Sequence, residues 1–74
     1  MQTENIKIST EFIKLDQLLK FSGIAESGAD AKDMILDGIV SVNGEVCTMR
    51  GKKLRPGDFA VLEFEDGSYR INVE

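Results

Sequence analysis

Basic residues are concentrated in one short segment of the sequence. Residues 46–57 contain no acidic residue, and the basic ones are Arg50, Lys52, Lys53 and Arg55. Arginine can contact a phosphate through two parallel hydrogen bonds, whereas lysine acts as a compact point charge. When such cations bind a polyanion, condensed counterions are released, and this release favours association. The segment therefore has the chemistry of a phosphate-binding surface.

The remainder of the chain carries the opposite charge. The 74 residues include nine bases and thirteen acids, for a net charge of −4. Outside residues 46–57, five bases stand against thirteen acids, a net charge of −8. A hydrophobic fraction of 42% is typical of a globular chain. The length fits one domain, which we place at residues 1–74.

Several residue types that enzymes use are missing. The chain has no histidine, and therefore neither an imidazole base nor a histidine metal ligand. Its single cysteine, Cys47, cannot form a Cys/His zinc site or an internal disulfide, and we expect it to be a half-buried strand residue. The acidic cluster Glu63–Asp66 precedes a glycine and is interpreted as a solvated turn. We therefore predict a protein that is not an enzyme and that needs no metal or cofactor.

The sequence also favours a cytoplasmic protein. A single cysteine is typical of reducing compartments. No apolar stretch approaches the roughly 20 residues that span a bilayer. The first residues lack the basic start and apolar run of a signal peptide. We expect a monomer that does not contact membranes.

The first predicted helix follows Phe12 and Ile13, which we expect to pack beneath it. Its apolar stripe has the i, i+3, i+4 spacing of one helix face and consists of Leu15, Leu18 and Leu19. Gly23 is placed to end this helix, because glycine adopts the left-handed conformation without a side-chain clash.

The second predicted helix has a clearer start. Ser27 is a good N-cap residue, and Asp30 at the third helical position gives a pattern similar to a capping box. Gly38 ends the helix. The buried stripe is predicted to be Ala31, Met34 and Ile35.

The same helix carries an acidic ridge. At about 100° per residue, four acidic side chains lie within roughly 60° of one another, opposite the apolar stripe. The residues of the acidic ridge are Glu26, Asp30, Asp33 and Asp37. Lys32 lies at one flank of the ridge. A phosphate backbone is repelled by the ridge, so a nucleic acid has to approach from the Lys32 side.

The second half of the chain has the pattern of β-structure. The predicted strands, the first of them at a sheet edge, are Ile6–Ser9, Val40–Val42, Glu45–Thr48, Phe59–Phe64 and Ser68–Val73. Asn43-Gly44 is a strong two-residue hairpin signal, and Asp66-Gly67 is a second hairpin signal. Arg55–Asp58 is a turn centred on Pro-Gly. We predict an α+β fold with two short packed helices on a small, mostly antiparallel sheet.

The order and spacing of these features resemble a known family, the S-four RNA-binding domain with its alpha-L motif. The residues that carry the resemblance are Lys14-Leu15-Asp16, Ser27, Ala31-Lys32, Ile35, Gly38, Val40, Val42-Asn43-Gly44 and Pro56-Gly57-Asp58. They cover about residues 12–62. The short chain is most similar to the stand-alone bacterial members of the family.

The resemblance implies non-catalytic binding of structured RNA, either ribosomal or transfer RNA, in ribosome assembly or translation. The positions that match RNA-binding positions of the family are Lys14, Ser27, Lys32, Asn43 and Gly44. Gly28 stands where the family usually has an arginine, which leaves the first backbone N–H groups of the helix open to a phosphate.

The basic segment extends this predicted interface beyond the positions that match the family. Arg50, Lys52, Lys53 and Arg55 would contact the phosphates. Four aromatic residues are expected in the core, with Tyr69 left open; the four are Phe12, Phe21, Phe59 and Phe64. We therefore expect recognition of duplex shape rather than base stacking.

Two other functions were compared with RNA binding. The acidic ridge could bind proteins, either alone or as a bridge between RNA and basic ribosomal proteins. A ubiquitin-like sulfur carrier is also small and acidic, but such carriers resemble one another in a Gly-Gly end, and this chain ends in Asn72-Val73-Glu74. We therefore set the sulfur carrier aside and keep the protein-interaction module as the alternative.

Overall fold

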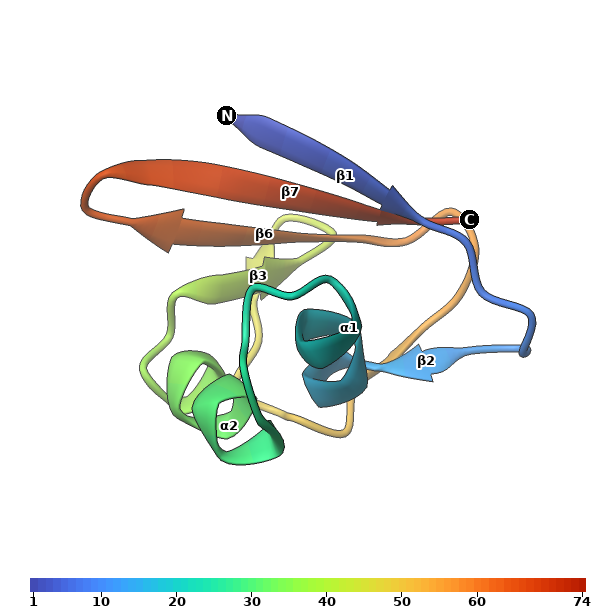
Figure 1. Cartoon of the computed structure of the whole chain (residues 1–74), viewed down its shortest axis with the longest axis horizontal. Coiled ribbons are helices and arrows are strands. Elements are labelled where there is room, and N and C mark those ends of the chain that lie inside the picture. Colours follow the sequence, from blue (N-terminus) through green and yellow to red (C-terminus); the bar gives the residue numbers. More distant parts are fainter.

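The computed structural model describes all 74 residues as a five-stranded sheet, a helix pair and a separate two-stranded ladder (Figure 1). The elements in chain order are β1 Gln2–Ile6, β2 Ile13–Lys14, α1 Leu15–Phe21, α2 Gly28–Leu36, β3 Val40–Val42, β4 Glu45–Val46, β5 Lys53–Leu54, β6 Phe59–Phe64 and β7 Gly67–Val73. The large sheet has the order β1-β7-β6-β3-β4, and only the β1–β7 pair is parallel. The predicted α+β class with a mostly antiparallel sheet is confirmed.

The helix boundaries follow from local chemistry. At the start of α2, the Ser27 hydroxyl accepts a hydrogen bond from the Asp30 amide at 3.1 Å, as the N-cap pattern predicts. The Asp30 carboxylate accepts from the Glu26 amide at 3.2 Å, one residue earlier than in a standard capping box. Gly23 and Gly38 follow the two helices with φ of +84° and +80°, which confirms them as helix ends.

The helix pair covers one face of the sheet (Figure 1). Alternate residues of β6 and β7 point to this face, because successive strand residues face opposite sides. Fourteen apolar residues form the buried core, and no buried polar side chain is among them. The core residues that are fully covered include Leu15, Leu18, Leu19, Ile35, Val40, Leu54, Leu62 and Ile71. The stripe predicted for α2 is confirmed for Ala31 and Ile35, whereas Met34 is half-buried.

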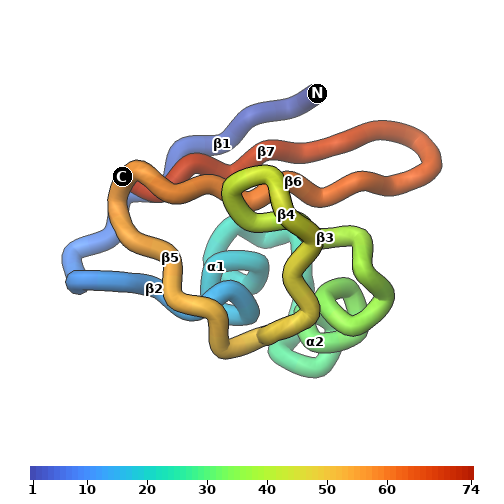
Figure 2. The backbone as a smooth tube through the Cα atoms, turned by 180° about the vertical axis from the view of Figure 1, so that it is seen from behind, coloured from blue at the N-terminus to red at the C-terminus, as the bar shows by residue number.

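The small ladder of β2 and β5 lies beside α1, away from the large sheet (Figure 2). Ile13 pairs with Leu54, and Lys14 pairs with Lys53. Leu54 is completely buried although it stands between two exposed basic residues, Lys53 and Arg55. Leu54 therefore fixes the basic segment to the core.

Several predicted details are wrong. The edge strand is β1 at Gln2–Ile6, not Ile6–Ser9, because its pairing with β7 aligns Ile6 with Val73 at the end of both strands. The strand after Asn43-Gly44 ends at Val46 instead of Thr48. In the last hairpin Phe64 pairs with Gly67, so the loop residues are Glu65 and Asp66.

The prediction for Phe21 is also wrong. Its side chain is 68% exposed, because it lies in the last turn of α1, past the buried stripe that ends at Leu19. Cys47 is half-buried, as expected, although it lies just beyond β4 rather than on a strand.

Leu54→Ala should lower the free energy of unfolding by about 2–5 kcal/mol, because it removes a fully buried side chain and leaves a cavity. Leu36→Ala is the matched control: Leu36 is 58% exposed, and its loss should cost less than about 0.5 kcal/mol. Urea denaturation followed by circular dichroism measures both values. Equal effects of the two substitutions would contradict the anchoring role of Leu54.

Candidate nucleic-acid interface

The backbone of the basic segment caps the first helix. The amide of Leu15 donates to the carbonyl of Lys52 at 2.8 Å, and the amide of Asp16 donates to the carbonyl of Arg50 at 3.1 Å. The first amides of an α-helix have no partner within the helix, and α1 has no side-chain cap. The carbonyls of residues 50 and 52 therefore replace a side-chain cap, and they hold the basic segment against the start of α1.

Lys14 joins the basic segment from the opposite strand. It precedes α1 and is the register partner of Lys53 in the β2–β5 ladder. Like charges placed directly opposite on paired strands repel each other. The five cations gathered here form the basic strip, which consists of Lys14, Arg50, Lys52, Lys53 and Arg55. All five are exposed.

An aromatic side chain lies within the basic strip. The Nζ of Lys53 is 4.8 Å from the centre of the Phe12 ring, and the Cζ of Arg55 is 5.9 Å from it. Both distances are in the range of cation–π attraction. Phe12 is half-buried rather than part of the core, so the prediction that it belongs to the core is wrong. The contact of Phe12 with the cations was not predicted, and the only signal for it in the sequence is its position two residues before Lys14.

The cations of the strip are not hydrogen-bonded to acidic side chains. No lysine or arginine side chain in the structure is hydrogen-bonded to a carboxylate. Arg70 lies outside the strip: its Cζ is 4.0 Å from the centre of the Phe59 ring, and its Nε donates to Asn72 at 2.8 Å. The strip is therefore available to an anionic ligand.

Asp58 organises the turn at the end of the strip. One carboxylate oxygen accepts from the Arg55 amide at 2.8 Å, and the other accepts from the Asn43 side chain at 3.1 Å. These two hydrogen bonds, together with the charges of Arg55 and Lys52, hold the pKa of Asp58 below its ordinary value of 3.8 against the opposing effect of burial. Asp58 thus joins the Arg55–Asp58 turn to the β3–β4 hairpin.

The β3–β4 hairpin has the predicted turn. Asn43 has a φ of +52° and Gly44 a φ of +92°, as a type I′ turn requires. The Asn43 side chain also accepts from the Phe59 amide at 3.0 Å. Both ends of the Asn43 amide group are therefore occupied within the protein, and its contact with RNA stays a prediction.

The start of α2 holds the remaining predicted RNA-binding residues. Ser27 uses its hydroxyl as the N-cap, Gly28 begins the helix, and Lys32 is exposed one turn later. The Asp30 carboxylate bonds to the Glu26 amide, which places a negative charge beside the amides that were predicted to receive a phosphate. The roles of Ser27, Gly28 and Lys32 in RNA binding stay predictions.

No helix combines the length and the apolar composition that crossing a membrane requires. No group of three or more Cys, Asp or Glu side chains is arranged to hold a metal ion.

These features define a small α+β domain that presents a cationic strip on an otherwise acidic chain. The profile of the S4 domain family matches residues 6–72, a wider range than the predicted 12–62. The chain is 42% identical over 67 residues to a Bacillus subtilis protein described as "Probable ribosome maturation protein RlbA". The alignment covers 89% of this chain and 92% of that relative. The chain belongs to the S4 domain family, as its sequence features indicated.

Asp58→Asn should remove a pH-dependent part of the stability. Because the folded-state pKa of Asp58 lies below 3.8, its charged form stabilises the fold above that pH, and the contribution is lost as the pH falls through the folded-state pKa. The difference in unfolding free energy between wild type and variant should be largest near neutral pH and should shrink below pH 3.8.

Urea denaturation at a series of pH values measures this difference. Asp33→Asn removes the same charge from the exposed face of α2 and controls for net charge. A difference between wild type and Asp58→Asn that stays constant from neutral to acidic pH would refute the role assigned to Asp58.

Proposed function

We propose that this chain binds structured RNA through backbone phosphates, catalyses no reaction, and serves in the maturation of ribosomes. The observation that carries the proposal is the basic strip, whose backbone is fixed on α1 and whose side chains make no hydrogen bond to a carboxylate. Membership of the S4 domain family supports it, and the name of the Bacillus subtilis relative supports the connection with ribosomes.

The geometry of the strip suits a phosphate backbone. Lys14 and Lys53 lie opposite each other with no acid between them, and a bound phosphate would relieve their repulsion. Arg50 and Arg55 can each contact a phosphate through two donors. Contacts to the backbone position an RNA but carry little sequence information. We therefore propose recognition of folded ribosomal or transfer RNA by shape.

The acidic ridge limits how the RNA can lie. Glu26, Asp33 and Asp37 are exposed, and their carboxylates repel phosphates. An RNA bound to the strip must therefore avoid this face of α2. The acidic ridge also supports a second candidate function, that of a protein-interaction module. In that case the exposed carboxylates of the ridge bind a basic protein while the basic strip binds RNA.

Removing three cations of the strip together, by Lys52→Ala, Lys53→Ala and Arg55→Ala, should weaken binding to any stable RNA hairpin by roughly 100-fold at about 0.1 M salt. If four to six phosphates are contacted, the slope of log K against log salt should be about −3 to −5 for wild type and nearer zero for the variant. Fluorescence anisotropy titrations at several salt concentrations measure both quantities.

The matched control carries the same change of charge at positions outside the strip: Lys7→Ala, Lys20→Ala and Arg70→Ala. It should keep the wild-type salt slope. Crosslinking in cell extract followed by RNA sequencing should recover ribosomal RNA with wild type and control, and far less with the strip variant. Unchanged affinity of the strip variant would remove these residues from the interface.

Phe12→Leu should weaken RNA binding about two- to fivefold without changing the salt slope. The substitution keeps an apolar side chain but removes cation–π contacts worth about 0.5–1 kcal/mol, so Lys53 and Arg55 lose more side-chain freedom on binding. Phe21→Leu is the matched control, because Phe21 is 68% exposed and has no cation over its ring. Affinity of Phe12→Leu equal to that of the control would show that the ring does not position these cations.

A further inference from the structure

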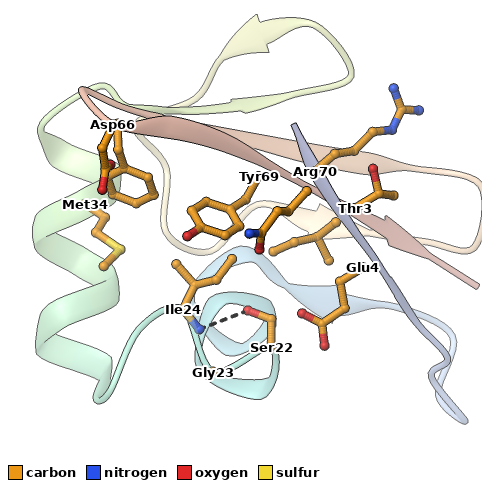
Figure 3. A pocket seen from close by; sticks show the side chains of 12 residues that line it. Thr3, Glu4, Ser22, Gly23, Ile24, Met34, Asp66, Tyr69 and Arg70 are labelled. Atoms are coloured by element: carbon orange, nitrogen blue, oxygen red, sulfur yellow. Dashed lines mark hydrogen bonds between the residues drawn. The ribbon is translucent and has the colours of Figure 1, made fainter.

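A groove lies between the helix-facing side of the sheet and the loop that joins α1 to α2 (Figure 3). Its volume is about 710 Å³, within the size range of ligand sites. The residues that define the groove are Glu4, Ile24, Met34, Phe64, Asp66 and Tyr69. They come from β1, the α1–α2 loop, α2 and the β6–β7 hairpin.

The floor of the groove is apolar and only partly covered. Tyr69 and Phe64 pack edge to face with ring centres 5.8 Å apart. Met34 and Ile24 face them from the helical side (Figure 3), and all four side chains are half-buried. The helix pair thus leaves the inner face of the β6–β7 hairpin only partly covered at this end of the sheet. An apolar side chain of a ligand would gain contact with Tyr69 and Met34.

Apart from Arg70, the charged side chains that line the groove are acidic. The Glu4 carboxylate points toward Ser22 at one side, and Asp66 stands beside Met34 at the other (Figure 3). Arg70 also borders the groove, but its guanidinium lies over the Phe59 ring and donates to Asn72, and it points away from Tyr69 (Figure 3). No lysine lines the groove. The complementary ligand is therefore cationic at two points with an apolar group between them.

The groove is bordered by backbone that can bind a peptide. β1 is the outer strand of the sheet, and it pairs on one side only, with β7. Its outward amides and carbonyls are therefore free to hydrogen-bond with an extended chain, as in strand addition at a sheet edge. A second copy of this protein fits poorly, because each copy carries a net charge of −4 and antiparallel β1 strands paired about Glu4 would bring carboxylates together.

We propose that this groove binds an extended basic segment of a partner protein, with an apolar side chain on Tyr69 and Met34 and lysine or arginine side chains reaching Glu4 and Asp66. The β2–β5 ladder, which carries Lys14 and Lys53 of the basic strip, lies at the opposite end of the molecule from the β6–β7 hairpin (Figures 1 and 2). The segment and an RNA can therefore bind at the same time.

The test uses the full chain and a short synthetic peptide that alternates lysine with leucine. Calorimetry should show saturable binding, and amide NMR shifts should change around Glu4, Met34 and Tyr69. The pair Glu4→Gln and Asp66→Asn should weaken binding roughly 2- to 30-fold, the range expected for the loss of two exposed ion pairs. Peptides with glutamate in place of lysine, or serine in place of leucine, should bind much more weakly.

The control pair, Asp33→Asn and Asp37→Asn, removes the same charge from the acidic ridge and should leave peptide affinity unchanged. Both pairs should bind an RNA hairpin as wild type does, so failure of this proposal is distinct from failure of RNA binding. Equal loss of peptide affinity in both pairs would indicate unspecific attraction and overturn the proposal. NMR shifts confined to α2 would also overturn it, as would a groove-dependent dimer in light scattering.

Discussion

The structure depends on one arrangement of backbone hydrogen bonds. The carbonyls of Arg50 and Lys52 accept from the first amides of α1, so a segment without regular secondary structure acts as a helix cap. The same residues that complete the helix thereby present their side chains to solvent. Leu54 enters the core immediately afterwards and fixes the direction of the chain. The position of the charges is thus set by the requirements of a helix end and of a hydrophobic core.

The distribution of charge gives this protein one cationic surface on an otherwise acidic chain. On an acidic chain, a strip that gathers five of the nine basic residues attracts polyanions more strongly than the rest of the surface, so attraction is directional. The cations of the strip make no hydrogen bond to a carboxylate, and two of them, Lys14 and Lys53, face each other in the β2–β5 ladder. Phe12 lies under two cations. The facing lysines lower stability slightly in the free protein, and a bound anion would relieve their repulsion.

Sequence patterns predicted those structural features that are determined by residues close together in the sequence. The Ser27 cap, the ends at Gly23 and Gly38 and the Asn43-Gly44 turn depend on a few neighbouring residues, and all are present. β1 could not be placed, because its residues are mostly polar and its partner β7 lies more than sixty residues away.

In the candidate sites, too, features that depend on neighbouring residues could be predicted from the sequence, and features that depend on distant residues could not. The cations of residues 50–55 are adjacent in sequence and were found, with Lys14 placed among them by the resemblance to the family. The pairing of Lys14 with Lys53 contradicts charge preference and was not predicted. Phe12 reaches the strip only through the folding of β2 against β5. The groove draws on four separate elements, so no single stretch of sequence could indicate it.

The parallel pairing of β1 with β7 has a consequence for the order of folding. The amide of Glu74 donates to the carbonyl of Ile6, and the amide of Ile8 donates to the carbonyl of Glu74, so the two ends of the chain are joined. Closing so long a loop carries an entropic cost that local contacts avoid. During synthesis the first strand has to wait for the last one to emerge. The outer edge of the sheet, and with it the side of the groove that β1 contributes, is completed only after translation has passed residue 73.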